Sequence, residues 1–280
     1  MADPSGSSSV AEAGTASREP GTEIEIQDLS VRYDEGEQTV LALDRINLTV
    51  RRNEFVCVMG PSGCGKTTLL YVIAGIVRPS SGTVLVEGEP VDRPGPDRAV
   101  VFQEDAVFPW MTVEQNIGYS LRMRGRPKEE IRAVVDRHVE LVGLQEFRRA
   151  WPRQLSGGMK KRVDLARGYA ANPKVLLMDE PFGALDIETK ERLQEELHSL
   201  WLVAPRTIVF ITHDLEEALF LGDRVILLSP RPGRIAETYV PDLDQKRDMS
   251  IKGSARFVSL STELRGKLKS FNVDVDAGAS

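Results

Sequence analysis

Short runs of apolar residues, each followed by a helix-like pattern, recur along most of this chain. The run Phe55–Met59 precedes a helical pattern over 68–74, and the runs 175–178 and 207–212 are also almost wholly apolar. Continuous apolar runs of this length are typical of strands buried on both faces, as in parallel sheets. Because they alternate with helical patterns up to Leu228, they predict an α/β fold with a mostly parallel sheet core.

Other parts of the chain show the patterns of antiparallel strands and of surface helices. Residues 24–32 alternate between apolar and polar, and the segment 83–86 follows a turn-rich stretch, so we expect an antiparallel β subdomain beside the core. Residues from about 104 to 158 predict a helical subdomain, which includes a charged helix over 128–142.

The two ends of the chain differ from this body. Residues 1–21 are rich in Ser, Gly, Ala and Pro, which predicts a disordered tail, and residues 22–240 form the expected main domain. Residues 241–280 form an extension whose apolar side chains have helical spacing, which predicts an amphipathic helix packed on the body. These side chains are Phe257, Leu260, Leu264, Leu268 and Phe271. A partner-binding or regulatory role for this helix is the alternative.

Composition limits the classes of function. The 280 residues, of which 41% are hydrophobic, suffice to bury a sizeable core, and the formal net charge of −6 argues against a nucleic-acid partner held mainly through its phosphates. No apolar run approaches the roughly 18 residues of a spanning helix, and the N-terminal residues lack the pattern of a secretion leader. We therefore expect a chain that neither crosses a membrane nor is secreted unaided. The two cysteines, Cys57 and Cys64, fit a reducing compartment without a disulfide framework.

The first candidate for chemistry lies between the apolar run that ends at Met59 and the helix after it, where the chain fits the pattern G-x-x-x-x-G-K-[ST]. Glycines let successive N–H groups turn toward an anion, and the helix N-terminus adds partial positive charge. Lys66 would reach the β- and γ-phosphates, and Thr67 would ligate Mg²⁺. The segment comprises Gly60, Pro61, Ser62, Gly63, Cys64, Gly65, Lys66, Thr67 and Thr68. A glycine-rich turn that binds nothing is the alternative.

A second glycine-rich segment, Leu155–Met159, also precedes a helical pattern. Ser156 and the amides of Gly157 and Gly158 would stand at the start of that helix, where they suit a γ-phosphate. The segment closely resembles the signature motif of the ATP-binding-cassette (ABC) ATPases. The resemblance implies a P-loop NTPase fold of the ABC type, ATP hydrolysis, and a head-to-tail homodimer or paired cassette. In such a dimer each signature segment faces the phosphate loop of the other subunit, and two ATP molecules lie between them.

Two adjacent acids follow the apolar run that ends at Met178. Asp179 would hold the Mg²⁺ shell, and Glu180 would accept a proton from, or orient, the water that attacks the γ-phosphate. A pair of solvated acids at a strand end is the alternative. The order of the segments, with the signature between the phosphate loop and the acidic strand, is the order of the ABC family.

The resemblance assigns roles to four further residues. His213 would contact the γ-phosphate and position the attacking water, and Gln103 would reach both Mg²⁺ and that water. Tyr33 would stack on adenine, although a surface tyrosine at a strand end is the alternative. Asp186 belongs to a loop that crosses the dimer interface.

An apolar segment stands where a loop is expected, Phe108–Met111, and indicates contact with another protein, with a local core cluster as the alternative. In ABC importers this neighbourhood receives a cytoplasmic helix of the membrane subunit. The segment 103–110, together with Met159 and residues 228–235, most resembles the nitrate, sulfonate and taurine importer branch. This resemblance implies a peripheral subunit on the cytoplasmic face of the membrane, bound to transmembrane permease subunits and served indirectly by a solute-binding protein.

Two other functions remain as alternatives. A soluble ABC-type ATPase of DNA repair or translation usually carries a coiled-coil insertion or tandem cassettes, and the sequence shows neither. A nucleotide-dependent scaffold that does not hydrolyse ATP should lack the base or the histidine, and both Glu180 and His213 are present.

A few residues do not follow the family pattern or have an open role. Lys160-Lys161-Arg162 stands where arginine-glutamine-arginine is frequent, and Asp164 and Gly168 stand where small or apolar helix formers are usual. A helix N-terminus next to Cys64 could lower the pKa of its thiol, but a small tolerated residue is the simpler interpretation. His138 and His198 fall in charged helical patterns and are expected to face solvent.

Overall fold

The computed structural model describes residues 21–277 apart from positions 37, 105 and 184. The tail expected over 1–21 therefore lies, except for Gly21, outside the described residues. The strands are β1 (Thr22–Glu35), β2 (Gln38–Arg51), β3 (Phe55–Met59), β4 (Ser81–Val86), β5 (Glu89–Pro90), β6 (Arg98–Val101), β7 (Val175–Asp179), β8 (Thr207–Ile211), β9 (Arg224–Leu228) and β10 (Ile235–Tyr239). The helices are α1 (Lys66–Ile73), α2 (Val113–Ile117), α3 (Tyr119–Met123), α4 (Lys128–Leu141), α5 (Gly157–Ala170), α6 (Ile187–Val203), α7 (Leu215–Leu221) and α8 (Ala255–Ala277), with 3₁₀ turns at Pro152–Gln154 and Met249–Gly253.

The central sheet has the strand order β10-β9-β3-β8-β7-β6. β9, β3, β8, β7 and β6 pair in parallel, and β10 joins the edge antiparallel to β9. Every residue of β3, β7 and β8 is buried, because helices or a second sheet cover both faces. The prediction of an α/β fold with a mostly parallel core is confirmed.

Alternate residues of β3 point into two different apolar clusters. Val56 and Val58 pack with α1 and with strands of the second sheet. Phe55, Cys57 and Met59 pack on the other side with side chains of α5, α6, α7 and α8. Since successive strand residues face opposite sides, the central sheet is the middle layer of the molecule.

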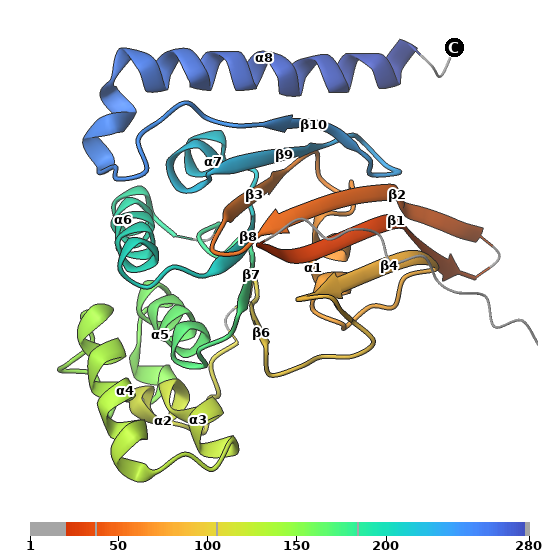
Figure 1. The fold of residues 1–280 in the computed structure, drawn as a ribbon. Coiled ribbons are helices and arrows are strands. Elements are labelled where there is room, and N and C mark those ends of the chain that lie inside the picture. Colours follow the sequence, from red (N-terminus) through yellow and green to blue (C-terminus); the bar gives the residue numbers. More distant parts are fainter. Residues whose placement is uncertain (1–20, 37, 105, 184, 278–280) are drawn as a thin grey trace, which may run out of the picture.

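The second sheet is antiparallel, with the order β2-β1-β4-β5. It confirms the expected antiparallel β subdomain, and it lies to one side of the central sheet, next to α1 (Figure 1). Ser81 and Gly82, which the sequence placed in a turn, are the first residues of β4.

A separate group of helices occupies the opposite end of the molecule (Figure 1). Its apolar cluster joins α2 and α4 to one face of α5, through Val113, Ile117, Val135, Val139, Val163 and Ala166 among others. α5 thus belongs to two cores at once, since Leu165 and Tyr169 face the central sheet.

The C-terminal extension packs on the side of the fold where β10 and α7 lie (Figure 1). Phe257, Leu260 and Leu264 of α8 are buried in the cluster that contains α7. Before this helix, the Arg247 guanidinium donates to the carbonyls of Leu219, at 2.6 Å, and Gly222, at 3.3 Å. The side chain of Phe271 lies outside the described residues. Among the described residues, no helix is both long and apolar enough to cross a membrane.

The expectation that both helical histidines face solvent is wrong. His198 is only 1% exposed, and its ring packs against Trp201 and Phe220 on the buried side of α6. Burial lowers the pKa of His198 to about 4, so the ring is neutral at physiological pH. His138 is partly buried, and its Nδ1 lies 2.7 Å from the carbonyl oxygen of Val134.

Candidate nucleotide-binding site

Four parallel strands end at the same edge of the central sheet, and each delivers one of the predicted groups. β3 leads into the phosphate loop, β6 leads to Gln103, β7 ends in Asp179 beside Glu180, and β8 leads to His213. The carboxyl edge of a parallel sheet is the usual place for ligands in such folds. The strand pairing therefore gathers residues that are far apart in the sequence.

The phosphate loop packs tightly against β2, and its lysine is bound to carbonyls of the loop. Gly65 has φ 102°, and a Cβ there would lie 2.7 Å from Cδ2 of Leu43 and 2.8 Å from the carbonyl oxygen of Ala42, so only glycine fits. Lys66 is 8% exposed, and its ammonium donates to the carbonyls of Gly60 and Pro61, both at 2.9 Å. A phosphate in this loop would take over the ammonium from these two carbonyls.

A cleft opens between the phosphate loop and the second sheet. Tyr33 stands at its rim, 37% exposed, and its hydroxyl donates to Oγ1 of Thr68 at 3.3 Å. The lining includes nine of the predicted residues together with three that were not predicted, Val40, Ala42 and Arg231. The nine are Tyr33, Ser62, Gly63, Gly65, Lys66, Thr67, Thr68, Gln103 and Glu180.

Thr67 and Asp179 form a pair of oxygen ligands beside this cleft. The Thr67 hydroxyl donates to Oδ1 of Asp179 at 3.2 Å. Asp179 is 3% exposed, and burial raises the pKa of its carboxyl above the ordinary value although the hydrogen bond from Thr67 opposes the shift. A buried carboxylate whose charge is disfavoured gains from a nearby cation.

Glu180 lies between the side chains of Gln103 and His213. Oε2 of Glu180 lies 3.1 Å from Nδ1 of His213 and accepts a hydrogen bond from Nε2 of Gln103 at 3.4 Å. Glu180 has φ 41°, a left-handed conformation that costs free energy in a residue with a side chain. This backbone turn at the end of β7 lets Glu180 face the same cleft that Asp179 borders.

The signature residues lie outside this cleft in the single chain. Ser156 caps α5 by accepting a hydrogen bond from the amide of Met159 at 3.3 Å, and Gly157 and Gly158 form the first turn of that helix. Asp186 likewise caps α6 and accepts from the amide of Thr189 at 2.9 Å. A carbon at Gly158 would lie 3.1 Å from Cγ2 of Thr189, so the starts of α5 and α6 are neighbours.

Arg231 is the charged residue among the three lining residues that the sequence did not predict. It belongs to the loop between β9 and β10, which is fixed to β2 because the amide of Gly233 donates to Ala42 at 2.9 Å and the Asp44 amide donates to Gly233 at 3.0 Å. A Cβ at Gly233 would collide with the carbonyl of Cys64, so the loop lies directly on the phosphate loop. Residues 228–235 carried a family likeness, but nothing in their spacing indicated that Arg231 lines the cleft.

Cys64 is buried within the phosphate loop, and burial raises the pKa of its thiol. The possibility of a lowered pKa at this helix N-terminus is therefore wrong, because desolvation of the thiolate outweighs the helix and Lys66. Cys57 and Cys64 are both free.

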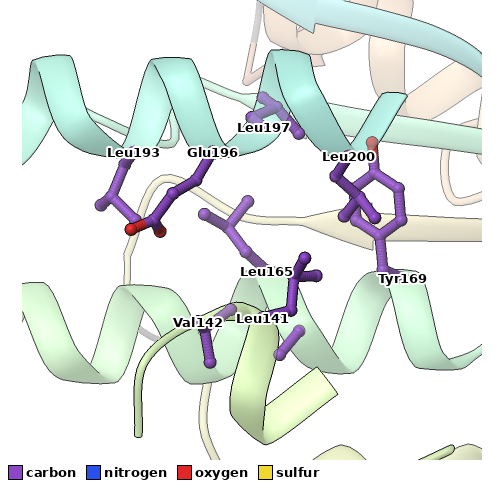
Figure 2. A pocket seen from close by; sticks show the side chains of 9 residues that line it. Leu141, Val142, Leu165, Tyr169, Leu193, Glu196, Leu197 and Leu200 are labelled. Atoms are coloured by element: carbon purple, nitrogen blue, oxygen red, sulfur yellow. The ribbon is translucent and has the colours of Figure 1, made fainter. Parts of the chain in front are cut away.

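A second hollow lies between α5, α6 and the end of α4, away from the cleft. Figure 2 shows its apolar wall, to which Leu165, Leu193 and Leu197 contribute, with Glu196 at one side. Burial raises the pKa of Glu196. This hollow shares no residue with the nucleotide-binding cleft and offers no phosphate-binding group.

Comparisons with known proteins agree with this geometry. The family model described as ABC transporter matches residues 43–183. The chain is 46% identical to the nitrate import ATP-binding protein of Synechocystis sp. over 88% of this chain and 95% of that protein. It is also 46% identical to the taurine import ATP-binding protein of Rhizobium johnstonii, over 83% and 91% of the two chains. Among solved structures, a dimeric ATP-binding cassette, MJ0796, bound to ADP and Pi matches with a TM-score of 0.70 and 31% identity, covering 78% of this chain and 98% of that one.

Proposed function

The chain belongs to the ABC transporter family of ATP-binding proteins, and on that basis we propose that it is the ATP-hydrolysing subunit of an importer for a small anionic solute such as nitrate, sulfonate or taurine. The observation that carries the proposal is the position of Glu180 at the edge of the phosphate-binding cleft, in contact with both Gln103 and His213. A scaffold that does not hydrolyse ATP has no need for a glutamate held in a left-handed backbone conformation at the edge of the cleft.

The roles of the residues follow from their places around the cleft. Backbone amides of the phosphate loop and the Lys66 ammonium would hold the β- and γ-phosphates of ATP. Glu180 would accept the proton of the attacking water or orient it, with His213 and Gln103 fixing the carboxylate and that water. Tyr33 would stack on adenine at the rim, where its ring is exposed.

The residues present fit a magnesium ion. Mg²⁺ prefers oxygen ligands and is usually held by one or two protein oxygens together with substrate phosphates and water. Thr67 Oγ1 and Asp179 Oδ1, 3.2 Å apart, would provide such oxygens, and Gln103 would provide a third. When bound, the ion would neutralise charge on the β- and γ-phosphates.

Two chains, or a pair of related cassettes, would complete the sites. Ser156, Gly157 and Gly158 present a helix start outside the cleft, so a γ-phosphate bound by Lys66 meets them only if they come from a second subunit. Asp186 and Ile187, whose side chain is 78% exposed, lie near the same surface at the start of α6. A solved cassette in the comparisons is dimeric, which supports this arrangement.

Trp110 supports a permease partner. The side chain is 66% exposed, whereas its neighbour Phe108 is partly buried between Trp110, Tyr119 and Arg167. Phe108 thus packs locally and Trp110 is left as the apolar contact for another protein. We propose that permease subunits bind here and hold the chain at the cytoplasmic face of the membrane, with a solute-binding protein delivering the solute to the permease.

One experiment tests hydrolysis. Glu180→Gln should bind ATP with nearly unchanged affinity while turnover falls by about 10²- to 10⁴-fold, and a closed dimer should accumulate in size-exclusion chromatography with ATP. Equal turnover of the two proteins would show that Glu180 is not the base.

A second experiment tests transport. The chain is expressed with candidate permease subunits, the complex is placed in vesicles, and ATPase activity is measured with a solute-binding protein loaded with nitrate, a sulfonate or taurine, or left unloaded. Stimulation by one loaded form would identify the solute. Full activity of a chain that binds no permease would favour the soluble ATPase instead.

A further inference from the structure

α5 carries a buried lysine that the chemistry of the cleft does not use. Lys161 is 4% exposed, and its ammonium donates to the carbonyl of Phe102 at 2.7 Å and to that of Gln103 at 3.0 Å. These carbonyls belong to the segment that follows β6, residues 102–104 and 106–108, called here the post-β6 segment. Gln103 is the residue of this segment that contacts Glu180.

Arg167, about one and two-thirds turns further along α5, contacts the other half of the post-β6 segment. Its guanidinium donates to the carbonyl of Ala106 at 2.6 Å and stands over the Phe108 ring, 4.9 Å from the ring centre. Asp164, 1% exposed and one turn before Arg167, forms an ion pair with that guanidinium. Two charged side chains of α5 thus bind one loop, and a third, Asp164, binds one of these two.

Such an arrangement is costly for a purely structural contact. Burying charged groups carries a desolvation penalty, and an apolar contact would hold the loop at least as well. Hydrogen bonds from charged groups are directional, so those of Lys161 and Arg167 fix the orientation of the loop backbone relative to α5.

α5 and the post-β6 segment together connect two parts of the protein that have separate proposed roles. α5 begins at the signature residue Ser156, and the post-β6 segment runs from Gln103, at the attacking-water side of the cleft, to Phe108, beside exposed Trp110. Asn116 of α2 fixes the same end, since the Phe108 amide donates to its Oδ1 at 2.7 Å. Both ends of the post-β6 segment are therefore bound to neighbouring helices, the Phe108 end to α2 and α5 and the Gln103 end to α5.

We propose that Lys161, Asp164 and Arg167 form a clasp that makes the post-β6 segment and α5 move as one body, so that permease contact at Trp110 and nucleotide contact at Ser156 are linked. The inference rests on the proposed function. The three residues are positioning residues, because none of them lines the nucleotide cleft, and Lys161 contacts the cleft-lining residue Gln103 through its backbone carbonyl. Linkage between two sites is reciprocal. A ligand bound at Ser156 should therefore restrain the post-β6 segment, and a partner bound at Trp110 should restrain Ser156.

Amide hydrogen exchange of the full chain tests the clasp, with Glu180→Gln as background so that ATP traps the closed dimer. In that background ATP should slow exchange both at the start of α5 and in the post-β6 segment. Adding Lys161→Met, which keeps the length of the side chain but removes both hydrogen bonds, should leave the slowing at α5 and reduce that in the segment at least tenfold. Lys161→Arg, which retains charge and donors, should restore it.

The controls separate coupling from stability. Lys252→Met removes another largely buried ammonium, which bonds Gln194 at 3.1 Å and Glu191 at 3.4 Å on α6, and it should leave both responses to ATP intact. If Lys161→Met does not fold, Lys161→Gln takes its place, with the same change expected in smaller measure. Equal slowing of the segment with and without the Lys161 ammonium would overturn the clasp. No slowing at α5 in the background protein would instead refute the proposed dimer, and with it the role of the clasp.

Discussion

The hydroxyl of Thr67 lies 3.2 Å from Oδ1 of Asp179, although 112 positions separate the two residues in the chain. Thr67 is in the first turn of α1 and Asp179 is the last residue of β7, so the pair forms only when the central sheet is assembled. Both oxygens border the phosphate loop. The protonation state of Asp179 is therefore coupled both to folding and to nucleotide binding.

Asp179→Asn should raise the stability of the nucleotide-free protein while weakening its use of Mg·ATP. Because burial raises the pKa of Asp179 in the folded state, ionisation at neutral pH opposes folding, and this cost disappears as pH falls through the folded pKa toward the unfolded value of about 3.8. Thermal melts without nucleotide should show a higher Tm for Asn at pH 7 and a smaller difference near pH 4. Mg²⁺-dependent hydrolysis should fall by more than the roughly 10- to 100-fold typical for loss of an outer-shell group. A lower Tm for Asn at pH 7 would contradict the sign.

Arg231→Ala should raise the KM for ATP by about two- to fivefold and leave kcat nearly unchanged, since an exposed cation near an anionic ligand contributes modestly to binding. The effect should shrink as salt is added, because exposed charges are screened. Arg231→Lys should fall between the two. Arg78→Ala, which removes an exposed arginine outside the cleft, serves as the control, and an equal effect from it would deny Arg231 a specific role.

Trp110→Ala should weaken binding to the permease by at least about 30-fold, the scale of a central interface residue, with the KM for ATP unchanged. Changing Phe108 as well would confuse the result, because its ring contacts Arg167. Trp151, 40% exposed on the same helical subdomain, provides the matched control when changed to Ala. The measurement is the affinity of each variant for the permease in detergent. Loss of binding in Trp151→Ala but not in Trp110→Ala would show that the permease binds near Trp151 instead.

His198→Leu should make the protein less sensitive to acid. The folded pKa is about 4 and the unfolded pKa about 6.5, so between these values the unfolded chain binds more protons and the free energy of unfolding falls as pH is lowered. This term is on the order of 3 kcal/mol near pH 4 and becomes negligible well above the unfolded pKa of about 6.5. Urea unfolding at pH 7.5, 6 and 5 should show a shallower decline for Leu than for His. Parallel declines would mean that His198 accepts its proton inside the folded protein.

The sequence predicted the central chemistry because its signals were local. The apolar runs of β3, β7 and β8 each end directly at a polar group, and parallel pairing brings such ends to one edge whatever the loops between them do. The phosphate loop and the signature segment are contiguous motifs. The presence of an α/β core with an antiparallel sheet followed from periodicity alone.

What the sequence did not predict depends on contacts between distant segments. His198 lies in a charged pattern, but α6 is covered on one side by α7 and the C-terminal extension, which periodicity does not reveal. Arg231 reaches the cleft only because Gly233 fits against Cys64. Lys161 and Asp164 looked like departures from a pattern, and only the structure shows the carbonyls that Lys161 binds.

The strand order has a consequence for how the protein is made. β8 lies between β3 and β7 in the sheet but is synthesised after both. Until the ribosome has released the residues of β8, the strand that carries the phosphate loop and the strand that carries Asp179 have no neighbour in common. A chain that ends before β8 therefore contains the phosphate loop, Asp179 and Glu180, but it lacks the strand that pairs with both β3 and β7 and holds the loop and the acids at one sheet edge.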